Sequence, residues 1–238
     1  MGSEPVLPRL SRRSVLVRGG GLAAGGMLMG VPLVEAGVAS ANSSSSCNES
    51  VETIVTIAAI AEALAVTTYY HGITSPPVFN AIEAGNRPYL RGALSEEDQH
   101  LLALMKAGAP KPQTTYHFAP GVFGTLSGFA KTLEALENAF ISAYGAAVNR
   151  FAVLNQPDLA QLAARILGVE AEHRFAIRDT IGDALPNNLV YEPAEFSCVS
   201  DAATALAPFL NGTGGHTVPR QMPSPAQIKS AVGPYKAA

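Results

Sequence analysis

Two Glu-x-x-His pairs are the residues of this chain with the clearest capacity for chemistry. They are Glu97 with His100 and Glu170 with His173. Residues three apart in an α-helix lie on the same side, so each pair can offer a carboxylate oxygen and an imidazole nitrogen to one point. Iron and manganese both accept such oxygen and nitrogen ligands. One such pair is a weak signal, but two of them predict the two halves of a metal site.

Two further glutamates lie on apolar helix faces. Glu62 has isoleucine, alanine and valine neighbours, and Glu137 has leucine, phenylalanine and isoleucine neighbours. A carboxylate on an apolar face costs free energy unless it is paired or bound to a metal. We therefore expect these glutamates to complete the set of metal ligands.

The chemistry-bearing residues repeat along the chain in the order Glu, Glu-x-x-His, Glu, Glu-x-x-His. Glu62 precedes Glu137 by 75 residues, and the two Glu-x-x-His pairs are 73 residues apart. Tyr69 and Tyr144 each follow the single glutamate of their half by seven residues. The repeat predicts two related helical hairpins that share one site. The alternative, solvated ion pairs and two satisfied core glutamates, is disfavoured by the matched spacing.

Four segments have the length and apolar periodicity of helices that would position these residues. They span residues 51–71, about 89–108, 126–154 and 157–181. The second helix begins either near Tyr89 or at Ser95, and we favour the earlier start. Residues 109–125 form a long connection that suits a crossover along a bundle. With no strand signal between them, these segments predict an all-α four-helix bundle.

This pattern resembles the ferritin-like superfamily of di-metal carboxylate bundles over residues 51–181. Within it, the sequence is similar to exported bacterial ferritin-like-domain proteins. The resemblance implies a bundle with a long 2–3 crossover that holds two iron ions, or manganese, and acts as an oxidoreductase on O₂, peroxide or ferrous iron. Two features depart from the family pattern. Gly92 suggests a short or broken second helix, and the irregular C-terminal extension over 182–238 argues against a hollow storage cage.

All six ligand positions of the family are filled in this chain. Which carboxylates bridge the metals is left open by the sequence. The tyrosines that follow the single glutamates are candidate catalytic residues, either as hydrogen-bond donors to a ligand carboxylate or as electron donors, and packing of the bundle is an equal alternative for them. The predicted metal ligands are Glu62, Glu97, His100, Glu137, Glu170 and His173, and the candidate catalytic residues are Tyr69 and Tyr144.

Other acids and histidines are expected to lie outside the site. Glu96 and Glu172 neighbour proposed ligands but point roughly 100° away on a helix. Glu134 lies one turn before Glu137 and is a less favoured extra ligand. The remaining histidines are expected at a helix end or in loops, and they are His71, His117 and His216.

The first 41 residues resemble a twin-arginine export signal. Arg12 and Arg13 precede an apolar, glycine-rich stretch, and 39–41 fits a small-residue cleavage site. A membrane anchor is disfavoured because Arg18 and many glycines interrupt the stretch. We expect the protein in the periplasm, the cell envelope or outside the cell, with residues 42–50 as a flexible lead.

Composition limits the classes of function. The net charge is −3 and no Lys/Arg-rich block occurs, which argues against nucleic acid as a partner. No apolar run of membrane-spanning length is apparent after the signal, and a homodimer is possible. Cys47 and Cys198 either pair or stay free thiols. The alternatives to an oxidoreductase are a non-catalytic binding or structural protein of the envelope and a metal-free helical bundle.

Overall fold

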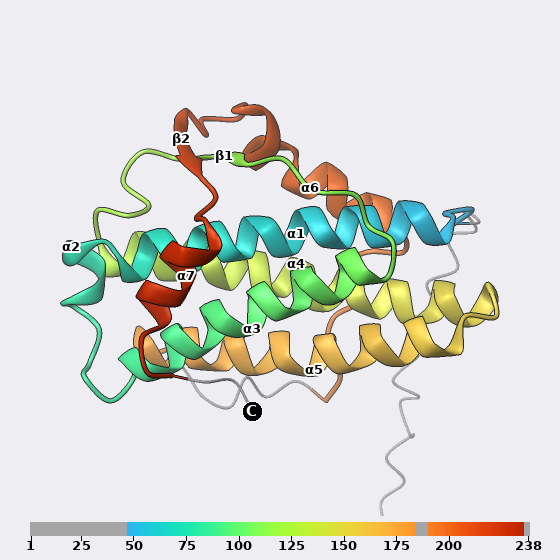
Figure 1. Cartoon of the computed structure of the whole chain (residues 1–238), viewed down its shortest axis with the longest axis horizontal. Helices are drawn as coiled ribbons and strands as arrows, with labels where there is room; N and C mark the ends of the chain where they lie inside the picture. Colours follow the sequence, from blue (N-terminus) through green and yellow to red (C-terminus); the bar gives the residue numbers. More distant parts are fainter. Residues whose placement is uncertain (1–46, 184–189, 236–238) are drawn as a thin grey trace, which may run out of the picture. The chain divides into compact units, whose positions relative to one another are not determined.

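A computed structural model of the chain describes residues 47–183 and 190–235, so the export signal lies outside the described residues. Most of the described chain is helical, which confirms the all-α fold class. Four long helices form a bundle (Figure 1). They are α1 (Val51–Ile73), α3 (Arg87–Lys106), α4 (Leu126–Val153) and α5 (Pro157–Thr180).

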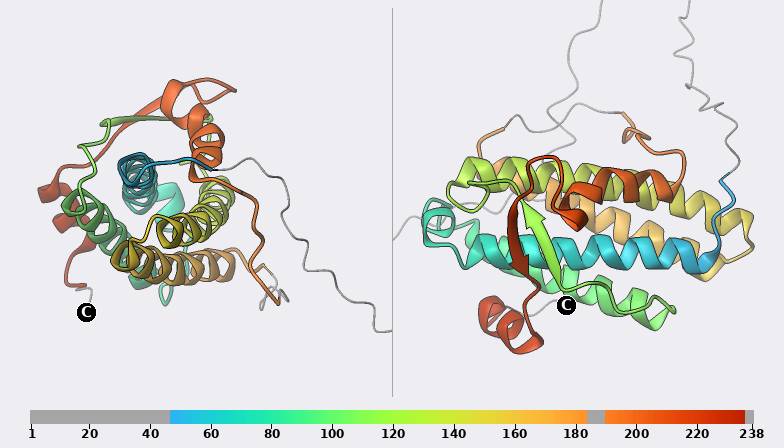
Figure 2. Two further views of the ribbon diagram at one scale, coloured as in Figure 1. Left: turned by 90° about the vertical axis from the view of Figure 1, so that its right-hand side faces the viewer. Right: turned by 90° about the horizontal axis from the view of Figure 1, so that it is seen from above.

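The four long helices lie side by side along most of their length (Figures 1 and 2). α1 packs against α3 and α4, and α4 packs along α5. The apolar core falls into two clusters, and each long helix contributes one stretch of residues to each cluster. Leu101 and Leu136 belong to one cluster, whereas Leu94 and Leu133 belong to the other. Glu97 and Glu170 lie between the two clusters in sequence, and Glu62 and Glu137 lie in the first cluster close to where the second begins. The bundle therefore supplies apolar packing on both sides of the predicted ligands.

Local signals explain where the long helices begin. The Ser50 side chain accepts a hydrogen bond from the backbone N–H of Thr53, and Thr125 does the same for Gly128. Each hydroxyl satisfies one of the free N–H groups of a first helical turn. Pro157 occupies the first turn of α5, where its missing N–H costs nothing.

Helix α3 is continuous through Gly92, so the expectation of a short or broken helix is wrong. It begins at Arg87, close to the earlier of the two predicted starts. A short helix, α2 (Pro76–Phe79), occupies the link between α1 and α3. A β-carbon at position 92 would lie 2.7 Å from the ring of Tyr235, so Gly92 permits a close approach of the C-terminal segment.

The crossover, in which the sequence gives no strand signal, contains a short strand. Residues of the crossover form β1 (Thr115–Phe118), which pairs antiparallel with β2 (Val218–Gln221) from the C-terminal extension. Tyr116 and Phe118 of β1 are fully buried. Each strand has only four residues and its partner lies about a hundred residues away in the chain, so local sequence gives little sign of the pairing.

The C-terminal extension packs on the bundle. Besides β2 it contains two helices, α6 (Val199–Asn211) and α7 (Pro225–Val232), so the extension is more regular than expected. α6 contacts α1, α4 and β1, and α7 contacts α3 (Figure 2).

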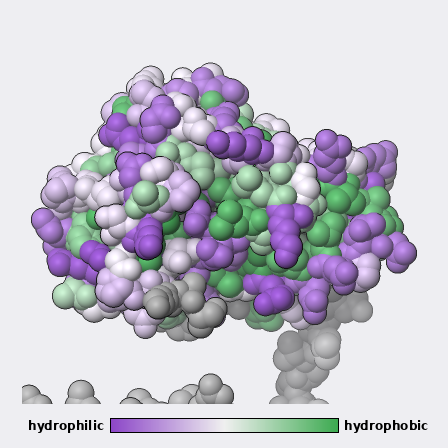
Figure 3. Space-filling model, in the orientation of Figure 1, coloured by the Kyte–Doolittle hydropathy of each residue, from purple (hydrophilic) through white to green (hydrophobic). Residues whose placement is uncertain are grey.

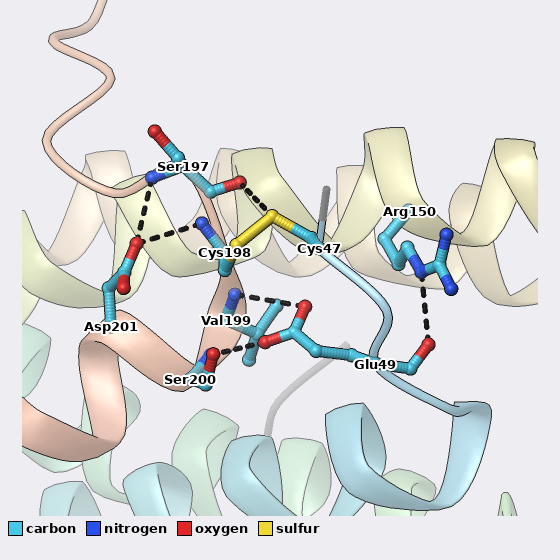
Figure 4. The surroundings of a disulfide bond; sticks show 8 residues. All are labelled: Cys47, Glu49, Arg150, Ser197, Cys198, Val199, Ser200 and Asp201. Carbon is cyan, nitrogen blue, oxygen red and sulfur yellow. Dashed lines mark hydrogen bonds between the residues drawn. A yellow bond between two sulfur atoms is a disulfide. The ribbon is translucent and has the colours of Figure 1, made fainter. Parts of the chain in front are cut away.

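A disulfide joins Cys47 to Cys198, with 5.6 Å between the two Cα atoms (Figure 4). Beside it, the Glu49 carboxylate accepts hydrogen bonds from the backbone N–H groups of Val199 and Ser200 at the start of α6. The end of the predicted flexible lead, from Cys47 on, is therefore tied to the C-terminal extension.

Helix α1 bears on the expectation that no apolar run of membrane-spanning length follows the signal. It is the one described helix long and apolar enough to cross a membrane by length and composition. Most of it is buried inside the bundle, and Glu62 lies in its middle. On the face shown in Figure 3, hydrophilic residues cover much of the surface, with hydrophobic residues gathered near the right-hand end. The burial of α1 is typical of a core helix.

Candidate metal centre

The four long helices bring all six predicted ligands to one place in the middle of the bundle. α1 carries Glu62 and α4 carries Glu137, whereas α3 and α5 each carry one Glu-x-x-His pair. All four carboxylates are fully buried. Because i and i+3 share a helix face, the glutamate and the histidine of each pair point to the same side.

The ligand atoms form two groups that overlap, and within each group they lie no more than 4.8 Å apart. Glu97 and Glu170 belong to both groups. Each group has in addition one glutamate and one histidine of its own. These additional residues are Glu62 with His100 in the first group and Glu137 with His173 in the second.

Both histidines present the same ring nitrogen to the carboxylates. The Nδ1 atom of His100 lies 3.2 Å from Glu170 Oε1 and 3.5 Å from Glu97 Oε2. The Nδ1 atom of His173 lies 3.0 Å from Glu97 Oε1 and 3.1 Å from Glu170 Oε2. The two imidazoles therefore face the shared pair of glutamates from its two sides.

Several buried carboxylate oxygens at this site have no hydrogen-bond donor among the described residues. They include one oxygen each of Glu62, Glu137 and Glu170 and both oxygens of Glu97. The imidazole contacts of these oxygens have ion-pair distances without hydrogen-bond geometry. Buried charge without such partners is costly, and oxygen-rich groups of this kind are what divalent cations accept. The donor set therefore fits a pair of metal ions.

Burial and mutual proximity shift the pKa values of the cluster in opposite directions. Burial raises the pKa of Glu62 and Glu137 well above their ordinary value of 4.5, and neighbouring carboxylates raise it further. Burial alone would lower the pKa of His100 and His173, but the facing carboxylates outweigh it and raise both values. Burial likewise opposes ionisation of Glu97, but the imidazoles hold its pKa well below 4.5.

The two predicted tyrosines hydrogen-bond the single glutamates crosswise. The Tyr69 hydroxyl on α1 donates to Glu137 Oε1 on α4 at 2.7 Å, and the Tyr144 hydroxyl on α4 donates to Glu62 Oε1 on α1. Burial, followed by the charge of these glutamates, raises the pKa of both hydroxyl groups. The hydroxyl groups therefore stay protonated and act as donors.

Glu96 was expected to point away from the site, and this expectation is wrong. Its Oε2 atom lies 2.9 Å from His173 Nε2, the ring nitrogen that faces away from the carboxylates. A turn of 100° from Glu97 directs Glu96 toward α5, which lies beside α3. Only the position of the neighbouring helix reveals this contact, so sequence spacing did not find it.

The other residues considered lie outside the two ligand groups. Glu134 forms an ion pair with Arg178 at 2.9 Å, and Glu172 is exposed. His71 at the end of α1 contacts the backbone oxygen of Gln221 in β2 at 2.9 Å. The remaining two histidines lie outside the four long helices. His117 is in β1, and His216 precedes β2.

Comparison with known protein families matches residues 49–183 to the ferritin-like domain. This range begins just before α1 and ends just after α5, so it covers the bundle and all six candidate ligands. Comparisons with curated proteins and with solved structures find no significant match. Since the matched range is more than half of the chain, the protein belongs to the ferritin-like domain family.

Proposed function

We propose that this protein is a dinuclear metal protein with an oxidoreductase activity. The observation that carries the proposal is the pair of overlapping ligand groups that share Glu97 and Glu170. In this arrangement the shared glutamates would contribute ligands to both ions. Glu62 and His100 would hold one ion, and Glu137 and His173 would hold the second.

The charge and type of the donors support two divalent cations. The four carboxylates carry a charge of about −4 when ionised, which two divalent cations neutralise. Carboxylate with imidazole suits iron and manganese. When bound, such ions change oxidation state and supply redox chemistry toward O₂ or peroxide, with ferrous iron as a further candidate substrate.

The residues of the chain supply geometry and a dry environment. The apolar clusters on either side of the site exclude water, which strengthens the electrostatic interactions inside it. The hydroxyl groups of Tyr69 and Tyr144 each hold one oxygen of a single glutamate, which directs the second oxygen into the cluster. Helical packing fixes the Nδ1 atoms of the histidines toward the same region.

Export is a further part of this proposal. The twin-arginine-like segment predicts a location in the periplasm, the cell envelope or outside the cell. The disulfide between Cys47 and Cys198 supports it, because disulfides persist in oxidising compartments.

Elemental analysis of the purified mature protein tests metal binding. We expect about two iron or manganese ions per chain. The variant Glu137→Ala/His173→Ala should lose stoichiometric metal, because it removes the two ligands that belong only to the second group. Glu172→Ala, an exposed position on the same helix, is the matched control and should retain both ions. Unchanged metal content in the double variant would refute the proposed site.

Turnover separates an enzyme from a structural metal protein. We expect the loaded protein to consume O₂ or peroxide, or to oxidise ferrous iron, in a manner that depends on Glu62. Two bound ions without any of these activities would show that the metal only stabilises the bundle. That result would favour the non-catalytic envelope protein.

A further inference from the structure

A chain of hydrogen bonds leads from the C-terminal extension to one half of the candidate metal centre. The Tyr235 hydroxyl donates to Glu96 Oε1 at 3.2 Å. The other oxygen of Glu96 lies 2.9 Å from His173 Nε2. Nδ1 of His173 faces Glu97 and Glu170. With a metal ion held at Nδ1, Nε2 would carry the proton and donate to Glu96.

Helix α3 has a gap that admits Tyr235. Gly92 lies one turn before Glu96, and a β-carbon there would come within 2.7 Å of the Tyr235 ring and 2.8 Å of its hydroxyl oxygen. Helix α7, which precedes Tyr235, packs against α3 and places the tyrosine there. Gly92 therefore leaves the space into which Tyr235 of the C-terminal extension packs.

Within the described part of the chain, the other half of the site has no such contact. The residue of the repeat that corresponds to Glu96 is Val169, which precedes Glu170 as Glu96 precedes Glu97. Over residues 47–183 and 190–235, His100 contacts carboxylates through Nδ1 only. Its side chain is also the more exposed of the two histidines, at 12% against 5% for His173. The two halves have the same types of ligand, but only the imidazole of His173 has a carboxylate on its second ring nitrogen among the described residues.

We propose that Glu96, held by Tyr235, is a positioning residue that makes the Glu137–His173 half the tighter of two unequal metal positions. The contact fixes the orientation and the tautomer of the His173 ring, so the lone pair of Nδ1 stays directed at the metal position. A carboxylate on the far nitrogen also makes a ligating imidazole a stronger donor. This inference rests on the proposed dinuclear function and assigns its asymmetry to residues outside the donor set.

Calorimetric titration of the metal-free, full-length mature protein with Mn²⁺ alone, without oxygen and with the disulfide intact, tests the inference. We expect two binding steps of different affinity. Glu96→Gln should weaken the tighter step by about tenfold or more, because loss of such a partner typically costs 10- to 100-fold in affinity. Tyr235→Phe should weaken the same step less. Glu172→Gln, an exposed glutamate, is the matched control and should change neither step.

A double-mutant cycle shows whether Glu96 acts through His173. In a His173→Ala background, Glu96→Gln should have no further effect on metal affinity. In a His100→Ala background, it should keep its full effect. A general loss of structure would instead weaken binding in both backgrounds, and thermal melting of each metal-free variant checks for it.

The outcomes distinguish this inference from the proposed function. If the wild-type protein binds two Mn²⁺ ions and Glu96→Gln leaves both steps unchanged, the positioning role is refuted and the dinuclear site stands. An equal effect of Glu96→Gln in the two single-histidine backgrounds also refutes it. If the wild-type protein takes up no metal, the proposed function itself fails, and the inference fails with it.

Discussion

At the scale of single residues, the two buried hydrogen bonds between tyrosine and glutamate connect α1 and α4 at the site. Tyr69→Phe keeps the shape of the side chain but removes the hydroxyl group that donates to Glu137 Oε1, an oxygen of a fully buried side chain. We expect a loss of about 1–3 kcal/mol in the free energy of unfolding of the metal-free protein. Urea denaturation of the metal-free protein measures it.

Tyr70→Phe is the matched control for this substitution, because it removes a hydroxyl group from the next residue of α1. The Tyr70 hydroxyl only accepts a bond from exposed Gln227 at 3.3 Å, so its loss should cost less than about 0.5 kcal/mol. Equal stabilities of the two variants would show that the Tyr69 hydroxyl does not hold Glu137.

The spacing of residues predicted these positions because helix geometry fixes them. A residue seven after a buried glutamate lies two turns along the same face, so Tyr69 and Tyr144 had to enter the same core. The crosswise pairing and the contact of Glu96 with His173 depend on the distance between helices. A single sequence does not contain that distance.

At the scale of the helices, substitution of two glycines in the bundle by alanine should change the stability in opposite directions. A β-carbon on Gly72 of α1 would overlap the ring of Phe129 of α4, which is fully buried. Gly72→Ala should therefore cost about 1–3 kcal/mol of stability despite the helix propensity of alanine. Urea denaturation measures the change.

Gly168→Ala is the matched control within the bundle. Nothing lies within 4 Å of a β-carbon at this position of α5, so the variant should gain about 0.5–1 kcal/mol. Shifts of the same sign in the two variants would contradict the close packing of α1 on α4.

The long helices were predictable because each has an apolar stripe, a capping residue or a proline at its start, and sufficient length. The strands and their pairing outside the bundle were not predictable in this way. β1 and β2 contribute four residues each, and their pairing joins the crossover to the extension. Gly92 suggested a break in α3, but its reason lies at Tyr235, far along the chain.

At the scale of the whole molecule, the C-terminal extension, which the family match does not cover, is attached to the bundle at several places. The disulfide fastens it beside the start of α1, the β1–β2 pair fastens it to the crossover, and α7 fastens it to α3. Its last described residue, Tyr235, reaches the candidate centre through Glu96. The extension is thus part of the environment of the site.

Removal of metal should make the stability of the whole bundle depend on pH. The raised pKa values of Glu62 and Glu137 mean that the folded, metal-free protein holds protons that the unfolded chain releases above 4.5. The same holds above 6.5 for His100 and His173. This stabilisation is complete below the pKa of the unfolded chain and is lost as pH rises through that of the folded protein.

Glu97 has the opposite sign, because its lowered pKa gives stability that is lost as pH falls through the folded value. That loss lies below the ordinary value of 4.5 and does not oppose the others at neutral pH. The melting temperature of the metal-free protein should therefore fall between about pH 5 and about pH 8.

Bound metal should remove most of this fall, because the cations replace the displaced protons and, at a thousandfold excess over Kd, each site adds about 4 kcal/mol. Calorimetric melting of the loaded and metal-free forms across this range measures the difference, which should widen as pH rises. Glu62→Gln/Glu137→Gln is the matched control, since neutral amides should remove the part of the fall that Glu62 and Glu137 cause in the metal-free profile. A wild-type metal-free profile that rises with pH would show that the four carboxylates do not face one another as the structure has them.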